Sequence, residues 1–140
     1  MNNININFIN FPQKYIATLK TVISITLIEE KIDICTLNCI IISDKNMIRL
    51  NEQYKQKKAI TDIISFLLIP KLFIGEIYIA KKYSQEQART YNNTWKAELA
   101  YLIIHGILHL CGYTDYTKTE KHKMIVKQDL LFNLIERKFF

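Results

Sequence analysis

The chain has 140 residues and a net charge of +6, and 49% of its residues are hydrophobic while 23% are charged. This composition excludes a disordered chain and suffices for one domain with a hydrophobic core. The basic balance favours an acidic partner such as nucleic acid, but lysines that only keep the protein soluble explain it equally well.

Two features of the sequence predict a cytoplasmic protein. The chain has three cysteines, an odd number, and its first ten residues, MNNININFIN, lack the features of a signal peptide. Reduced thiols are therefore expected, with Cys35 and Cys39 buried in an apolar strand. The longest apolar stretch, LAYLIIHGILHLCGY, is shorter than the ~20 residues that a membrane span needs.

The first half of the chain alternates between strand and helix patterns. Residues 3–9 alternate polar and apolar side chains, which predicts a strand, and a helical pattern begins after Pro12. A second, β-branched strand starts at Cys35, and Asp44 is the expected N-cap of a short helix. A basic loop, KQKKAI, follows Tyr54.

The second half predicts two strands followed by helices. The strands are TDIISFLLI (61–69), closed by Pro70, and FIGEIYIA (73–80). Helices are expected near residues 84–92, from about 94 to 111, where Gly112 ends the helix, and from about 117 to 138. The last helix is expected to direct four side chains inward: Met124, Leu130, Leu131 and Leu134. The sum is a single α+β domain over residues 1–140, with a small mixed sheet of about four strands covered by helices.

The segment HGILHLCGYTD, residues 105–115, has the spacing of a metal site. His105 and His109 lie one helical turn apart on one face, and a turn at Gly112 can bring Asp115 back toward them. Two imidazoles and a carboxylate suit zinc and leave a position open for water, as in catalytic zinc sites. The alternative is a pair of core histidines satisfied by hydrogen bonds, and His122 is expected at the surface.

The spacing of these ligands is that of metzincin proteases, with one difference. Those enzymes carry a glutamate as general base directly after the first histidine, whereas this chain has Gly106. The difference argues against an ordinary protease. Glu98, two helical turns before His105, is a candidate to orient a ligand, and the alternative is an exposed helix glutamate.

Three segments together resemble the YbeY endoribonuclease family, the bacterial rRNA maturation factors. They are HGILHLCGYTD (105–115), LNEQYKQKKAITDIISF (50–66) and GEIYIA (75–80), their order and spacing fit those of the family, and the resemblance spans most of the chain. The resemblance implies an α+β domain with one zinc ion, a basic cleft, and cleavage of single-stranded RNA in the maturation of ribosomal RNA, especially the 16S 3′ end.

Two positions depart from the family pattern. Asp115 stands where the family usually has a third histidine ligand, and Lys55 stands where it commonly has an arginine important to activity. Aspartate still binds zinc, whereas lysine keeps the charge but cannot clamp phosphate with two hydrogen bonds. Lys57 and Lys58 extend the basic loop. Tyr54, Phe66 and Tyr78 are expected either to stack on bases or to belong to the core.

The sequence therefore predicts a cytoplasmic, zinc-dependent endoribonuclease, with a monomer favoured and with the ribosome and its RNA as partners. The metal ligands are expected to be His105, His109 and Asp115, with Lys55 as a catalytic cation. Nickel or cobalt could occupy the same ligands. The alternatives are a metallohydrolase of another class, such as a peptidase, and a non-catalytic ribosome-assembly factor with a structural metal.

Overall fold

The structure, a computed structural model, describes residues 3–55 and 59–140, without the side chains of Lys55 and Phe139. The elements, in chain order, are β1 (Asn3–Ile9), α1 (Gln13–Glu29), β2 (Ile34–Ile42), α2 (Asp44–Lys55), β3 (Ile63–Ile69), a short 3₁₀ turn η1 (Pro70–Leu72), β4 (Ile74–Ala80), α3 (Lys81–Thr90), α4 (Trp95–Leu110) and α5 (Lys118–Phe139). This order and the mixed sheet confirm the predicted α+β class.

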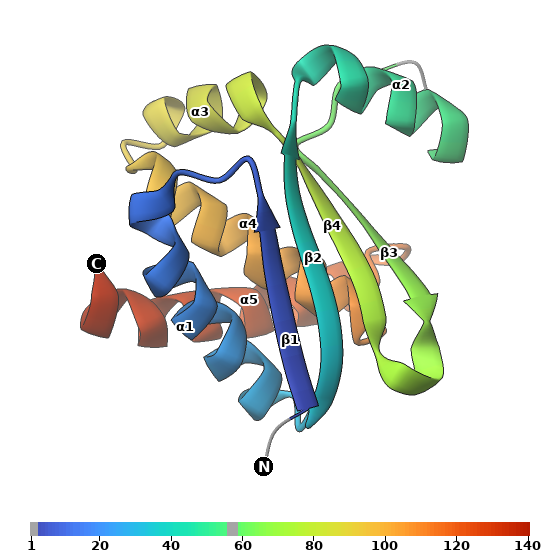
Figure 1. The fold of residues 1–140 in the computed structure, drawn as a ribbon, viewed down its shortest axis with the longest axis vertical. Coiled ribbons are helices and arrows are strands. Elements are labelled where there is room, and N and C mark those ends of the chain that lie inside the picture. The colour runs from blue at the N-terminus through green and yellow to red at the C-terminus, as the bar shows by residue number, and fades with distance from the viewer. Residues whose placement is uncertain (1–2, 56–58) are drawn as a thin grey trace.

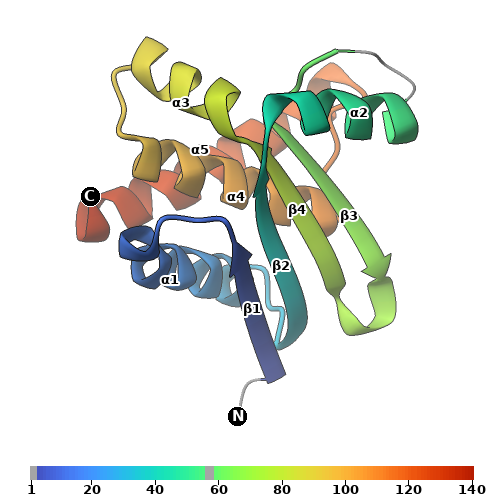
Figure 2. The same cartoon turned by 45° about the horizontal axis from the view of Figure 1, so that its top comes forward.

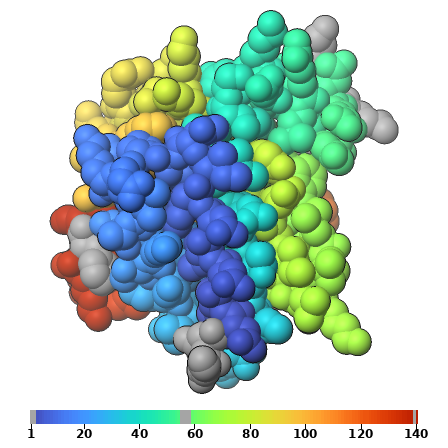
Figure 3. All heavy atoms as spheres, in the orientation of Figure 1, coloured from blue at the N-terminus to red at the C-terminus, as the bar shows by residue number. Residues whose placement is uncertain are grey.

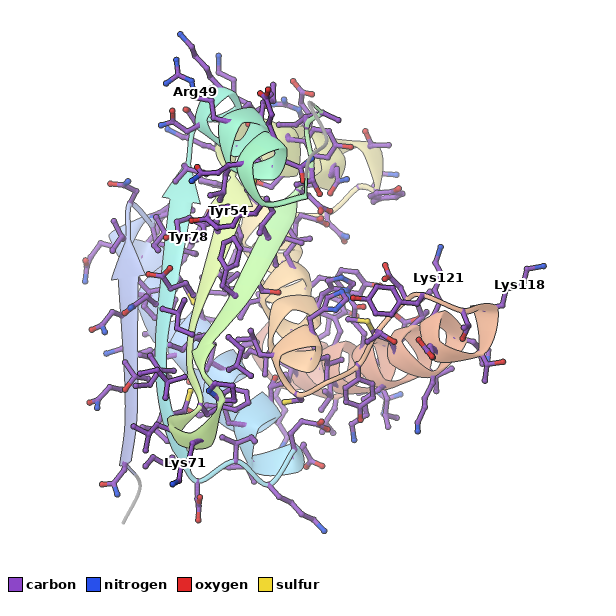
Figure 4. The ribbon with its side chains drawn as sticks, turned by 90° about the vertical axis from the view of Figure 1, so that its right-hand side faces the viewer. Arg49, Tyr54, Lys71, Tyr78, Lys118 and Lys121 are labelled. Carbon is purple, nitrogen blue, oxygen red and sulfur yellow. The ribbon has the colours of Figure 1, made fainter. Side chains whose placement is uncertain are left out.

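The four strands form one sheet in the order β1-β2-β4-β3 (Figure 1). The first three strands of that order run parallel, and β3 pairs with β4 in the antiparallel direction. Helices α1, α4 and α5 cover one face of the sheet, while α2 lies over one end of the opposite face (Figure 4). The antiparallel edge strand β3 therefore borders both the buried helix α4 and the more open face.

The core lies between the sheet and the helices on its covered face. Alternate residues of β2 and β4 point into it, because successive side chains of a strand face opposite sides. Cys35, Cys39 and Ile77 are buried there, as the strand patterns predict. Burial raises the pKa of Cys35 to about 11 and that of Cys39 to about 12, so both thiols stay protonated at neutral pH.

The start of α2 differs from the expectation by one residue. Ser43, and not Asp44, supplies the side-chain cap, since its Oγ accepts a hydrogen bond from the Asn46 backbone N–H at 3.1 Å. Asp44 is instead the first helical residue, and its Oδ1 accepts a hydrogen bond from the Tyr83 backbone N–H. The carboxylate thus ties α2 to α3, a contact that no local pattern reveals.

The inward face of α5 was only partly predicted. Met124 and Leu131 are buried as expected, but Leu130 is 62% exposed and Leu134 is 47% exposed. The buried positions of α5 are 124, 128, 131 and 135, which recur at helical spacing against α4. The expectation was wrong because Gln128 occupies a buried position that a hydrophobic pattern assigns to solvent.

Helices α2 and α3 both begin at the end of the sheet where β2 and β4 finish (Figure 2). In Figure 3, α1 and β1 form the surface on the opposite side from β3. None of the helices within residues 3–55 and 59–140 is long and apolar enough to cross a membrane.

Candidate metal centre and active site

Helix α4 presents one narrow face that is not fully buried. The helix starts after Thr94, whose Oγ1 accepts a hydrogen bond from the Ala97 backbone N–H at 3.1 Å, as an N-cap does. Between Ala97 and Leu110 every residue is buried except Tyr101, His105 and His109, which are half-buried. These three are four residues apart, so they lie along one line of the helix.

The two histidine rings are neighbours at the C-terminal end of α4. Their centroids are 4.6 Å apart and their planes are inclined by 77°. The prediction that His105 and His109 share a helix face is therefore confirmed.

Gly106 explains why a glutamate cannot follow the first histidine here. A Cβ at this position would lie 2.9 Å from Cδ1 of Ile77 and 3.1 Å from Cδ1 of Ile63. Residue 106 therefore faces the sheet, where α4 packs closely against β3 and β4, and any longer side chain would collide with the core. A buried carboxylate would also be costly there.

The chain reverses after α4 at Gly112, as the sequence predicts. Gly112 has φ +102°, a conformation that favours glycine, and its backbone N–H donates to the His109 carbonyl at 3.0 Å. Thr117 then caps α5, and its Oγ1 accepts a hydrogen bond from the Glu120 backbone N–H. The turn between the helices carries Asp115, which is exposed.

A cavity of about 220 Å³ opens between α4 and the first part of α5. Its polar lining residues are Asp62, Tyr101, His105, Asp115, Lys121 and Gln128. His105 and the predicted third ligand, Asp115, therefore face the same space. Lys121 adds a cation to a wall that also carries two carboxylates, those of Asp62 and Asp115.

The imidazole nitrogens and the carboxylate oxygens at this site are the kinds of atom that bind zinc in proteins. The Gln128 Oε1 lies 2.9 Å from Nδ1 of His105, so Nε2 is the ring nitrogen that does not face Gln128. Two imidazoles with a carboxylate are a common zinc set. In the described part of the chain, however, no three His, Cys, Asp or Glu side chains form a group placed to hold a metal ion. Asp115 as the third ligand stays a prediction.

Glu98 is buried, so the alternative of an exposed glutamate is wrong. It is 5% exposed, and Gln87, with its amide oriented to donate, bonds from Nε2 to Glu98 Oε2 and to Asp62 Oδ2, at 3.1 Å each. Burial, with a smaller contribution from the nearby Asp62 carboxylate, raises the pKa of Glu98 from 4.5 to about 7. Because Asp62 also lines the cavity beside His105, the Glu98–Asp62 carboxylate pair is linked to the histidine site through Asp62.

The basic loop cannot be placed against this cavity. Lys55 is the last residue of α2, but its side chain, together with Lys57 and Lys58, lies outside the described residues. Tyr54 and Phe66 do contact each other, with ring centroids 4.7 Å apart.

Tyr78 completes a row of aromatic rings on the sheet face opposite α4. The Phe66 and Tyr78 centroids are 5.9 Å apart, and Tyr54 at the end of the row is 57% exposed. Figure 4 shows Tyr54 and Tyr78 beside α2, across β3 from Lys121. Phe66 and Tyr78 are half-buried in packing contacts, which leaves Tyr54 as the ring with most surface for stacking.

The fold and the histidine face together define an α+β domain with two adjacent imidazoles on α4, one of which, His105, lines a polar cavity. Residues 2–136 match the family model described as Endoribonuclease YbeY, and the chain belongs to this family. It is 52% identical over 134 residues to Endoribonuclease YbeY of Endomicrobium trichonymphae, covering 96% of this chain and 94% of that protein.

Two further relatives agree. Endoribonuclease YbeY of Bacillus subtilis is 36% identical over 107 residues, which is 66% of this chain and 68% of that protein. The solution structure of TM1509 from Thermotoga maritima superposes with a TM-score of 0.68 at 30% identity, over 94% of this chain and 88% of that chain. The predicted family, fold class and enzyme class, a nuclease, are confirmed.

Sequence reasoning missed several residues of the cavity. Asp62 lies in the segment 50–66, but no sequence pattern assigned it a role. Tyr101 has the same four-residue spacing as the two histidines, so that spacing could have placed it on their face of the helix. Gln128 and Lys121 come from α5 and carried no local signal, because only the packing of α5 on α4 brings them to His105.

Proposed function

We propose that this chain is a zinc-dependent endoribonuclease that cleaves single-stranded RNA in the maturation of ribosomal RNA, including the 16S 3′ end. The observation that carries the proposal is the pair of adjacent imidazoles on α4, one of which, His105, lines a cavity together with Asp115 and Lys121. Membership of an endoribonuclease family supports RNA as the substrate class. We expect the protein to act in the cytoplasm, with the ribosome as its partner and as a monomer.

His105, His109 and Asp115 would hold the metal. A zinc ion bound there would supply Lewis-acid chemistry to the scissile phosphate. Lys121, in the cavity wall, and Lys55, at the position where the family commonly has arginine, would offset the negative charge that builds on the phosphate oxygens. Tyr54 offers a ring for stacking on an unpaired base, which favours single strands over duplexes.

The two alternatives predict different substrates and different outcomes. Position 106 has no room for the glutamate that a zinc peptidase needs, which disfavours the peptidase. A non-catalytic assembly factor would bind RNA and metal without cutting.

The test compares metal-loaded wild type with a folded His109→Ala variant on single-stranded RNA, duplex RNA and casein. Cleavage of single-stranded RNA that the variant lacks supports the proposal. Equal RNA cleavage by both proteins indicates a contaminating nuclease, cleavage of casein supports the peptidase, and RNA binding without cleavage supports the assembly factor.

A further inference from the structure

Gln128 is a buried polar residue that touches the histidine site from the neighbouring helix. It is 3% exposed and lies on α5, at one of the positions of that helix that pack against α4. Its side chain makes two contacts with α4: Oε1 lies 2.9 Å from Nδ1 of His105, and Nε2 donates to the Tyr101 carbonyl at 3.4 Å.

These two contacts fix the direction of the amide. A backbone carbonyl can only accept, so the nitrogen end of the Gln128 amide must face Tyr101 and the oxygen end must face His105. An amide oxygen also only accepts, so Nδ1 of His105 carries the proton. In a neutral imidazole the lone pair then lies on Nε2, the nitrogen that points away from Gln128.

The surrounding contacts hold Gln128 in place. The Tyr101 hydroxyl donates to Asp129 Oδ1 at 3.0 Å, and the Tyr101 ring packs edge-on against Phe132 at 5.4 Å. Two residues that follow Gln128 on α5 therefore contact Tyr101, the same residue of α4 whose carbonyl Gln128 contacts. Burying an amide costs free energy that an apolar side chain of similar length would not, so the contact with His105 is not explained by packing alone.

We propose that Gln128 is a positioning residue that holds His105 in the Nδ1–H tautomer and so presents Nε2 as a metal ligand. The neutral histidine side chain in water favours a proton on Nε2, and a histidine in that form would have to exchange tautomers before binding a metal through Nε2. The role in metal binding rests on the proposed function, whereas the tautomer is a property of the metal-free chain.

The test uses three variants of the full chain, each checked for folding by circular dichroism and thermal unfolding. Gln128→Met keeps the length and removes the acceptor, and Gln128→Glu keeps an acceptor oxygen. Gln53→Met is the matched control, because Gln53 is exposed on α2. Nitrogen-15 NMR of the imidazoles, in metal-free protein at about pH 8.5, where histidine is neutral, reports the tautomer of His105 directly.

We expect His105 to be Nδ1–H in wild type, Gln128→Glu and Gln53→Met, and mostly Nε2–H in Gln128→Met. In competition with a chelator, Gln128→Met should bind zinc about 10–100-fold more weakly than wild type, as loss of a ligand's hydrogen-bond partner does elsewhere. Gln128→Glu should stay within about threefold of wild type or bind more tightly.

An Nε2–H proton in wild type, or an unchanged tautomer in a folded Gln128→Met protein, would overturn the proposal. If the tautomer of His105 changes with the side chain at position 128 as expected, the result supports the proposal even in a protein that fails to cleave RNA. Failure of wild type to bind zinc at all would instead contradict the proposed function, so the two failures are distinguishable.

Discussion

Asp115 is an exposed carboxylate on the turn between α4 and α5, facing the same cavity as His105. If it is the third ligand, Asp115→Ala should weaken zinc binding by more than about 100-fold, since losing a ligand costs more than losing a ligand's partner. Asp115→His, which restores a ligand of the type usual in the family, should retain zinc. Metal content after dialysis against a chelator measures both, and full zinc occupancy in Asp115→Ala would exclude residue 115 as a ligand.

Lys121 lines the cavity, whereas Lys118, one turn earlier on α5, provides a matched exposed lysine (Figure 4). Lys121→Met should weaken binding of a single-stranded RNA oligonucleotide and reduce the slope of log affinity against log salt by about 0.7, the value for one lost phosphate contact. Fluorescence anisotropy in the presence of a chelator measures binding without cleavage.

The control for this prediction is Lys118→Met, which removes the same charge from the same helix. It should change the affinity by less than half as much as Lys121→Met. Equal losses in the two variants would show that α5 attracts RNA only through its net charge, with no specific contact at the cavity.

At the scale of the element, the rotation of α5 about its own axis can be tested. Leu131 is 2% exposed and Leu130 is 62% exposed, although the two are adjacent. Leu131→Ala should lower the free energy of unfolding by about 2–5 kcal/mol, and Leu130→Ala should change it by less than about 0.5 kcal/mol. Urea denaturation of the two variants measures the difference, and similar losses in both would mean that α5 is rotated on α4.

At the scale of the whole molecule, Glu98 makes stability depend on pH. Its pKa rises from 4.5 to about 7 on folding, so the folded state holds this proton more tightly than the unfolded state does. The stabilisation that Glu98 gives the folded state is fully present below pH 4.5. It is lost as the pH rises through 7, and the loss in free energy of unfolding is about 3 kcal/mol at most.

Glu98→Gln removes this titration. The variant should gain stability relative to wild type as the pH rises from about 5 to about 8. Urea unfolding of both proteins across that range measures the gain. Glu86→Gln, at an exposed position of α3, is the control and should follow wild type at every pH. A constant difference between Glu98→Gln and wild type would contradict the assignment.

Short-range patterns in the sequence predicted much of this protein's structure. Alternation predicted β1, β-branched apolar residues predicted β2, and the four-residue spacing put His105 and His109 on one face of α4, because these patterns depend only on neighbours along the chain. The glycine turn at Gly112 follows from the same local rule. The family resemblance rested on these segments, and the matching family model confirms it.

The tertiary structure alone decided what surrounds the histidines. Gln128 is 23 residues from His105 in sequence, and the two meet because α5 returns across α4. A glutamate side chain ordinarily has a pKa of 4.5, yet packing buries Glu98 beside Asp62 and raises its pKa to about 7. Such contacts depend on how helices pack across long loops, and the energy of that packing is shared among many side chains that no local pattern relates to one another.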